Sequence, residues 1–214
     1  MSVKLNPEKA LIFRIVHVAN VPWILDHGGL ECPNSRAPDP NFVNIGNKSL
    51  IDKRSRFPVP IPPGGTLSDY VPFYFTPFSP MLLNILTGYG GITKRERSDI
   101  VLFVSSIHRL RDLGTPFVFT NQHAYAAGTD YYDRIEDLDK IDWPLLQSRN
   151  FKTDDADPGK PLRYQAESLI HQRVPLEALL GIGCHNDSVQ RKLETEVEQR
   201  GTSLSVQSIP KWYF

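Results

Sequence analysis

The sequence predicts an α+β domain in which strands and helices follow one another in irregular order. Several short runs rich in β-branched and aromatic residues are typical of strands. One segment near the C-terminus has the apolar period of an amphipathic helix. Helices and strands do not alternate regularly, which argues against βαβ winding. A chain of 214 residues suffices for one substantial core, so we expect a single domain over residues 1–214.

The first quarter of the chain predicts a strand, a short helix, a long loop and a second helix. Residues 11–18, LIFRIVHV, form the strand, and Asn20 is placed to cap a helix through WILDH. Residues 31–45 are polar and contain proline, and loops of this length in compact domains are often functional. Residues 46–56 predict a basic helix, which PVPIPPGG then ends.

The remaining three quarters supply most of the strands. Strands are predicted for YVPFYF, DIVLFVS, PFVFT, RYQAESLI, LLGIGCH and, as an edge strand, SLSVQSI. Helices are predicted for SPMLLNILTG and DSVQRKLETEVEQR, the second being clearly amphipathic. Residues 121–163 are polar and aromatic with short helical patches, and we expect Tyr125, Tyr131 and Tyr132 in a loop.

Composition and charge exclude several classes of protein. Twenty-four basic and 24 acidic residues give no net charge, which argues against a DNA-packaging polycation but allows a local basic groove. No apolar window is long enough to span a membrane. Cys32 and Cys184 are far apart, and the six histidines are scattered without metal-ligand spacing. We therefore expect a cytoplasmic protein without disulfides or a metal site.

No short catalytic motif is present. The Walker A, G-x-G-x-x-G, G-x-S-x-G and H-E-x-x-H patterns are all absent. The candidate polar residues are scattered: Arg14 and His17 on the first strand, Arg54 in the basic helix, His123 after PFVFT, and Glu167 in a late strand. Spacing alone favours an ordinary surface or core role for each of them.

Longer blocks of sequence resemble the DarT family of DNA ADP-ribosyltransferase toxins. These blocks are LIFRIVHVANVPWIL, IGNKSLIDKRSRFPVP, PPGGTLSDYVPFYFTPFSPM, PFVFTNQHAY and RYQAESLI, and the match continues to the final WYF. The resemblance implies an ADP-ribosyltransferase-like fold, with two facing, mostly antiparallel sheets, peripheral helices and an NAD⁺ cleft between the sheets.

The resemblance also implies the activity. DarT proteins transfer ADP-ribose from NAD⁺ to a base in single-stranded DNA, and a macrodomain antitoxin, DarG, reverses the modification. We expect NAD⁺ as substrate and thymidine as the favoured acceptor. Because a fold does not fix the acceptor, guanosine or a protein side chain is the alternative. A catalytically inactive binding module is a third hypothesis, against which the intact arginine and glutamate argue.

The same resemblance assigns the site residues. Glu167 is expected to stabilise the positive charge that develops on the ribose and to accept the proton of the attacking base. Arg54, favoured over Arg56 by its spacing, is expected beside Glu167 at the reaction centre. The residues expected to contact NAD⁺ are Arg14, Ile15, His17, Asn20, Gly46, Arg54 and Tyr74, and those expected to contact the DNA are His123 and Tyr125.

Two positions depart from the commoner family pattern, namely Arg14 and Phe78. We therefore expect backbone groups of the first strand, rather than its side chains, to hold the nicotinamide. If Glu167 is an unpaired carboxylate held ready for a ligand, its removal should raise the stability of the fold.

Overall fold

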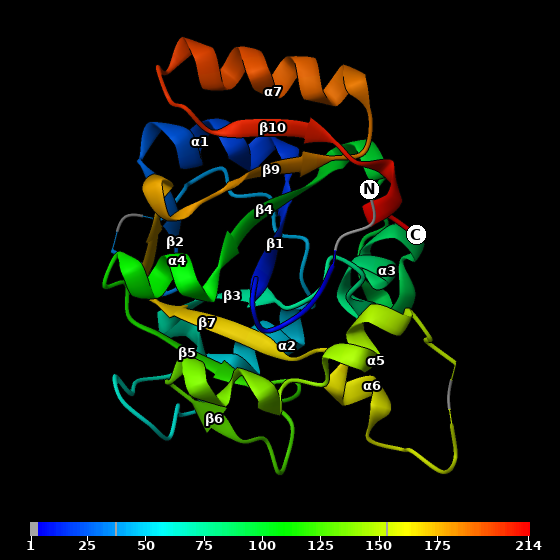
Figure 1. Cartoon of the computed structure of the whole chain (residues 1–214). Coiled ribbons are helices and arrows are strands. Elements are labelled where there is room, and N and C mark those ends of the chain that lie inside the picture. The colour runs from blue at the N-terminus through cyan, green and yellow to red at the C-terminus, as the bar shows by residue number, and fades with distance from the viewer. Residues whose placement is uncertain (1–3, 37, 153) are drawn as a thin grey trace.

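The computed structural model describes residues 4–36, 38–152 and 154–214, and eight of its strands form one long sheet (Figure 1). The strand order is β10-β9-β4-β1-β3-β7-β5-β6, and every neighbouring pair is antiparallel except β9 with β10. These strands are β1 (Leu11–His17), β3 (Tyr70–Tyr74), β4 (Ile100–Ser106), β5 (Phe117–Thr120), β6 (Tyr131–Tyr132), β7 (Glu167–His171), β9 (Gly181–Cys184) and β10 (Ser205–Ser208).

The long sheet divides between β1 and β3. Strand β1 pairs with β4 along its whole length, whereas its only register pair with β3 is Phe13 opposite Tyr74. The two mostly antiparallel sheets that we expected are therefore present as two halves of one sheet, β10-β9-β4-β1 and β3-β7-β5-β6. A separate small sheet pairs β2 (Gly29–Glu31) with β8 (Arg173–Pro175). The junction between the halves is where a cleft can open.

The hydrophobic core lies against the central strands. All seven residues of β4 are buried, as a continuous apolar run predicts. The amphipathic helix α7 (Asp187–Gln199) buries Val189, Leu193 and Val197 against the β9–β10 edge, and Figure 1 shows it running alongside β10. Each of these residues is four positions from the next, so all three share one helix face. Core packing thus fixes β4 and, through the pairing of β1 with β4, also fixes β1, which forms one wall of the cleft.

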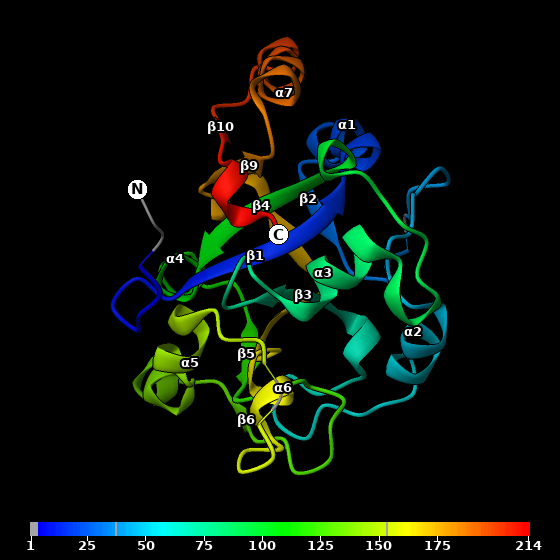
Figure 2. The same ribbon diagram turned by 90° about the vertical axis from the view of Figure 1, so that its right-hand side faces the viewer.

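Short helices surround the sheet. They are α1 (Val21–Asp26), α2 (Lys48–Arg54), α3 (Pro80–Thr87), α4 (Ile107–Asp112), α5 (Trp143–Ser148) and α6 (Lys160–Arg163). The side chains of Asn47 and Ser79 cap α2 and α3 by accepting backbone N–H groups. Figure 2 shows α2 and α3 together on one side of β3, with α5 and α6 towards the opposite lower side.

Two predicted segments differ from the structure. The strand predicted for RYQAESLI begins only at Glu167, because the residues before it form α6 and a turn in which Ala166 N–H bonds to the Arg163 carbonyl. A strand over the whole of RYQAESLI would place Gln165 on the same face as Glu167, but Gln165 lies in the turn before the strand. Tyr131 and Tyr132, expected in a loop, pair with Thr120 and Phe119 as strand β6.

The helices are also short relative to a lipid bilayer. In the described part of the chain, none combines the length and the apolar character needed to cross a membrane.

Candidate active site

A cavity of about 370 Å³ lies in the wedge where β1 and β3 separate. One wall is β1 from Arg14 to His17, and the other is β3 from Tyr70 to Tyr74. Helix α2 and the loop at residues 30–47 close its sides, while His123 and Glu167 lie at its inner end. A cavity of this size is within the range of small-molecule sites in enzymes.

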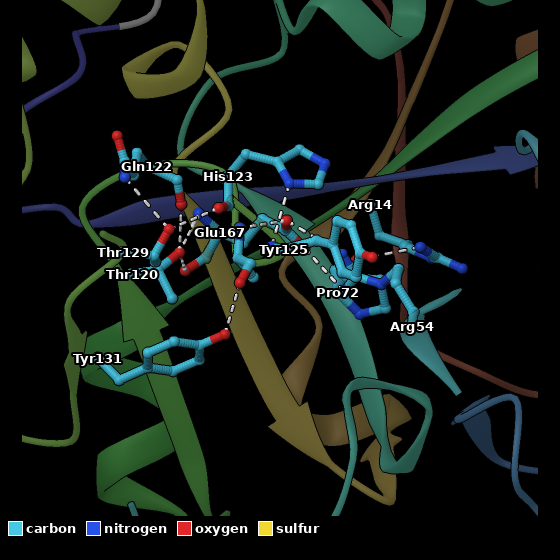
Figure 3. Close-up of polar contacts among 11 residues, drawn as sticks. Arg14, Arg54, Pro72, Thr120, Gln122, His123, Tyr125, Thr129, Tyr131 and Glu167 are labelled. Carbon is cyan, nitrogen blue, oxygen red and sulfur yellow. Dashed lines mark hydrogen bonds and ion pairs between the residues drawn. The ribbon is translucent and has the colours of Figure 1, made fainter. Parts of the chain in front are cut away.

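Arg54 and Glu167 form a two-point ion pair inside this cavity. Arg54 Nη1 donates to Glu167 Oε1 at 3.1 Å, and Nη2 donates to Oε2 at 2.9 Å. The side chains are only 12% and 1% exposed, so water screens the pair little. Arg54 ends helix α2 and Glu167 begins strand β7, and Figure 3 shows the two side chains meeting between these elements. This pair is the strongest electrostatic feature of the cavity.

Glu167 remains a carboxylate despite its burial. Burial raises the pKa of the Glu167 carboxyl, but Arg54, His123 and the Ala124 N–H together bring that pKa below its usual value. Oε1 accepts from Arg54 and, at 3.0 Å, from Ala124 N–H, whereas among the described residues Oε2 accepts only from Arg54. Oε2 therefore has capacity for one more hydrogen bond or a proton.

The loop after β5 holds its shape through its own hydrogen bonds. The Thr129 hydroxyl lies within hydrogen-bond distance of the His123 and Ala126 carbonyls and has one proton to share between them. The Tyr131 hydroxyl donates to the Ala124 carbonyl. Figure 3 shows Thr129 and Tyr131 on the opposite side of Glu167 from Arg14 and Arg54. The loop thus presents the Ala124 N–H to Glu167 in a fixed position.

The same loop fixes the tautomer of His123. Its Nδ1 accepts the Tyr125 N–H at 3.1 Å, so the neutral ring carries its proton on Nε2. His123 is 8% exposed and lines the cavity beside Glu167. The imidazole can therefore act as a hydrogen-bond donor towards a bound molecule.

Arg14 on β1 and Tyr74 on β3 are polar residues near the junction of the two half-sheets. Burial lowers the pKa of Arg14 to about 10, and its Nε has no partner among the described residues. The guanidinium does donate from Nη1 to the Pro72 carbonyl at 3.2 Å. Burial, with Glu167 nearby, raises the pKa of Tyr74. The cavity thus holds a second guanidinium with unused donors.

Asn20 ties the long loop to the body of the protein. Contrary to our expectation, its side chain does not cap α1 but bonds to both backbone groups of Val43. Asn20 is 1% exposed, and the bonds are 2.9 Å and 3.1 Å long. The loop predicted to be functional therefore forms part of the cavity wall and is held there by a residue just beyond β1.

The structure gathers nine of the predicted site residues into one cavity: Arg14, Ile15, His17, Asn20, Gly46, Arg54, Tyr74, His123 and Glu167. Tyr125 is the exception, because it lies in a neighbouring hollow against Phe57. Phe78 is outside the cavity lining and is buried beneath the Arg149 guanidinium, which lies 3.7 Å from the centre of the Phe78 ring. The departure at Phe78 therefore does not alter the cavity wall.

Sequence reasoning missed much of the apolar lining. The additional residues include Trp23, Leu30, Cys32, Phe42, Ile45, Ile51, Met81 and Ile85. Only the length of the 31–45 loop signalled any of them, since isolated apolar residues give no functional pattern. In the ranges that the structure describes, no group of three or more potential metal ligands is present.

A cleft between two mostly antiparallel half-sheets, with a buried glutamate at the start of a central strand, defines a protein of the ADP-ribosyltransferase class. The chain belongs to the DarT family, whose family model is described as ssDNA thymidine ADP-ribosyltransferase, DarT, and matches residues 13–214. A DNA ADP-ribosyl transferase of Escherichia coli O127:H6 (strain E2348/69 / EPEC) is 53% identical over 213 residues, covering 100% of this chain and 97% of the relative.

Solved structures agree with this assignment. Thermus sp. 2.9 DarT in complex with ADP-ribosylated ssDNA superposes with a TM-score of 0.90 at 29% identity, covering 100% of both chains. The same protein in complex with NAD⁺ gives a TM-score of 0.86 at 30% identity, covering 97% of this chain and 99% of that chain. The expected fold is confirmed.

Proposed function

We propose that this protein transfers ADP-ribose from NAD⁺ to the thymine base of single-stranded DNA and releases nicotinamide. The observation that carries the proposal is the buried Arg54–Glu167 pair at the inner end of a cavity between the half-sheets. Membership of the DarT family supplies the reaction class, and the relatives in complex with NAD⁺ and with ADP-ribosylated ssDNA support both substrates.

Glu167 serves both halves of the reaction. As the bond between nicotinamide and ribose C1 breaks, positive charge develops on the ribose, and a fixed carboxylate stabilises it. The thymine N3 then bonds to C1, and its proton passes to Glu167. Oε2 is the oxygen with a free acceptor position among the described residues. Arg54 holds the carboxylate in place and keeps it ionised until then.

NAD⁺ contacts are assigned to the walls of the cavity. The backbone of β1 at Arg14 and Ile15 suits the nicotinamide amide, whose donor and acceptor match main-chain groups. Gly46 lies on the loop that closes the side, and Tyr74 and His17 line the same space from β3 and β1. Asn20 contributes by holding that loop.

The acceptor is selected by hydrogen-bond polarity. Thymine has carbonyls on both sides of N3–H, whereas cytosine replaces one of them with an amine. The Nε2–H of His123 is a donor, because the ring's other nitrogen is occupied by Tyr125 N–H. If cytosine were bound, its amine would face the Nε2–H of His123, and both donors would be left unpaired. The cost of two unpaired donors is large enough to reject cytosine. A paired duplex hides N3, so the strand must be single.

The proposal is tested by incubating the protein with labelled NAD⁺ and four acceptors: a thymine-containing oligonucleotide, the same strand with every thymine replaced by cytosine, a full duplex, and a protein mixture. Label is expected only on the first, and mass spectrometry should place it on thymine. Label on guanine or on protein would reject the acceptor while leaving the reaction class intact. Glu167→Ala is the control for enzyme-dependent transfer.

Two further assignments belong to the same proposal. The protein acts as a toxin in the cytoplasm, where NAD⁺ and transiently single-stranded DNA are both present, and its partner is a macrodomain antitoxin of the DarG type. Expression of the wild type should arrest growth, and coexpression of a DNA-ADP-ribose hydrolase should relieve the arrest. Growth arrest that persists with Glu167→Ala would contradict this role.

A further inference from the structure

An open hollow adjoins the cavity on the outer side of helix α2. It is lined by Ser49, Asp52, Lys53, Arg56, Phe57 and Tyr125. The hollow shares two walls with the cavity. On α2, Arg54 faces the cavity while Lys53 faces the hollow, and on the loop after β5 His123 faces the cavity while Tyr125 faces the hollow.

Two aromatic rings form the apolar part of this hollow. The rings of Phe57 and Tyr125 lie 4.9 Å apart between centroids and are tilted by 58°. Both residues are half-buried, and they pack on a core cluster that includes Val59 and Leu169. The core therefore holds the rings in place while part of each remains open to solvent. Held aromatic faces of this kind are stacking platforms for unpaired bases.

Two cations lie beside the rings. Lys53 and Arg56 are exposed at the end of α2 and just beyond it, and neither forms an ion pair with another described residue. Asp52 also lines the hollow, so the hollow carries two positive charges and one negative charge. Unpaired cations next to a stacking surface fit the phosphate and the base of one nucleotide.

We propose that this hollow binds the nucleotide adjacent to the acceptor thymidine, with its base on Tyr125 and Phe57 and its phosphate at Lys53 and Arg56. The proposal rests on the proposed function, which places the acceptor base at Glu167 and His123. His123 and Tyr125 are two residues apart, so their Cα atoms are separated by at most about 7 Å. Neighbouring nucleotides of an unstacked strand can span that separation. The hollow thus makes the enzyme sensitive to the base beside the target.

Binding of DNA is measured without turnover in a Glu167→Gln background, by fluorescence anisotropy of a labelled oligonucleotide with a single thymine. Tyr125→Leu should weaken binding by about tenfold, as loss of one base–aromatic stack typically does. Tyr125→Phe should bind within about twofold of the background, because it keeps the ring. Leucine preserves apolar packing against Phe57, so this pair of variants separates stacking from support of the loop. Tyr89→Leu, at an exposed tyrosine beyond α3, is the matched control and should have no effect.

The position of the base is tested with oligonucleotides that carry an abasic residue on one side of the thymine. On one of the two sides, the abasic residue should remove the base that stacks on Tyr125 and should weaken binding as much as Tyr125→Leu does. Tyr125→Leu should then weaken binding of that abasic oligonucleotide little further, because both changes remove the same contact. Additive losses, or equal binding by Tyr125→Leu and Tyr125→Phe, would overturn the proposal.

The phosphate contact is tested by salt dependence. Replacing Lys53 or Arg56 by alanine should each reduce the slope of log Kd against log salt by about one, whereas Lys192→Ala on α7 should not. An unchanged slope would reject the phosphate contact. If Tyr125-dependent binding is present but wild-type protein transfers nothing to DNA, the proposed function fails and the binding site stands. Transfer to DNA that does not depend on Tyr125, Lys53 or Arg56 would instead support the proposed function and reject the binding site.

Discussion

Arg54 and Glu167 are 113 residues apart in sequence, yet their side chains meet through two parallel hydrogen bonds of 2.9 Å and 3.1 Å. Neither residue has a comparable second partner of opposite charge among the described residues. The pair is therefore a unit, in which each charge makes the other tolerable in a buried position. A change to either residue should affect the fold as well as the reaction.

Removing one member should abolish transfer and also weaken the fold. Glu167→Ala leaves the nearly buried Arg54 unpaired beside Arg14, and loss of one partner from a buried ion pair typically destabilises by about 3–5 kcal/mol. If Glu167 were unpaired, as we considered from the sequence, its removal would raise the stability of the fold. The ion pair reverses that expectation. Urea denaturation measures whether Glu167→Ala lowers or raises the free energy of unfolding. The double variant Glu167→Ala with Arg54→Met should recover much of the lost stability, because no buried charge is then left unpaired. A rise in stability for Glu167→Ala alone would show that the pair does not form.

Stability should depend on pH at the acid end through the same carboxylate. The pKa of Glu167 is lower in the folded protein than its usual value of 4.5. A lowered folded pKa stabilises the fold above pH 4.5 and loses that contribution as the pH falls through the folded value. The free energy of unfolding of the wild type should therefore drop more steeply below pH 4.5 than that of Glu167→Gln. Parallel curves for the two proteins would contradict the shift.

Substitution of Arg54 should lower kcat, whereas substitution of Arg56, two positions further along the chain, should not. Arg54→Lys keeps the charge but cannot form two parallel bonds, so kcat at saturating DNA should fall by about a hundredfold. Arg56→Lys, whose side chain faces the outer hollow, should keep the wild-type kcat. The reverse order of effects would place the wrong arginine at the reaction centre.

Substitution of Asn20 should raise the KM for NAD⁺ without changing the KM for DNA. Asn20→Ala leaves the Val43 N–H and carbonyl without their partner and frees the loop over the cavity. The KM for NAD⁺ should rise by about tenfold, equivalent to about 1.4 kcal/mol. The KM for DNA should stay unchanged. Asn41→Ala is the control, because Asn41 is exposed on the same loop; an equal effect there would indicate general loop sensitivity.

Replacing Arg14 by methionine should stabilise the free protein but weaken its binding of NAD⁺. Its pKa is lowered to about 10 by burial and its Nε lacks a partner among the described residues, so Arg14→Met should raise the stability of the free protein by about 1 kcal/mol. We propose that the unused donors of the Arg14 guanidinium pair with the pyrophosphate, so the same variant should bind NAD⁺ about tenfold more weakly. Nicotinamide alone, which lacks phosphate, should bind both proteins equally by calorimetry. Weaker binding of nicotinamide would instead place Arg14 at the ring.

The sequence by itself determined the elements and the family. Runs of β-branched and aromatic residues located β1 and β4, because both strands are largely buried. The apolar period located α7, because only one face of that helix is buried. The long blocks around YVPFYF and QAE carried the family, and with it the assignments of Arg54 and Glu167. No local pattern linked these two residues to each other.

Tertiary structure decided how the residues combine. The pairing of Arg54 with Glu167 depends on α2 lying opposite the start of β7, and the tautomer of His123 depends on the Tyr125 N–H bending back to its ring. Asn20, which sequence placed as a helix cap, instead bonds to a loop 23 residues away. Sequence spacing fixes which face of an element a residue occupies. Which element lies opposite that face is set by long-range packing, and for that reason only the folded chain reveals the site.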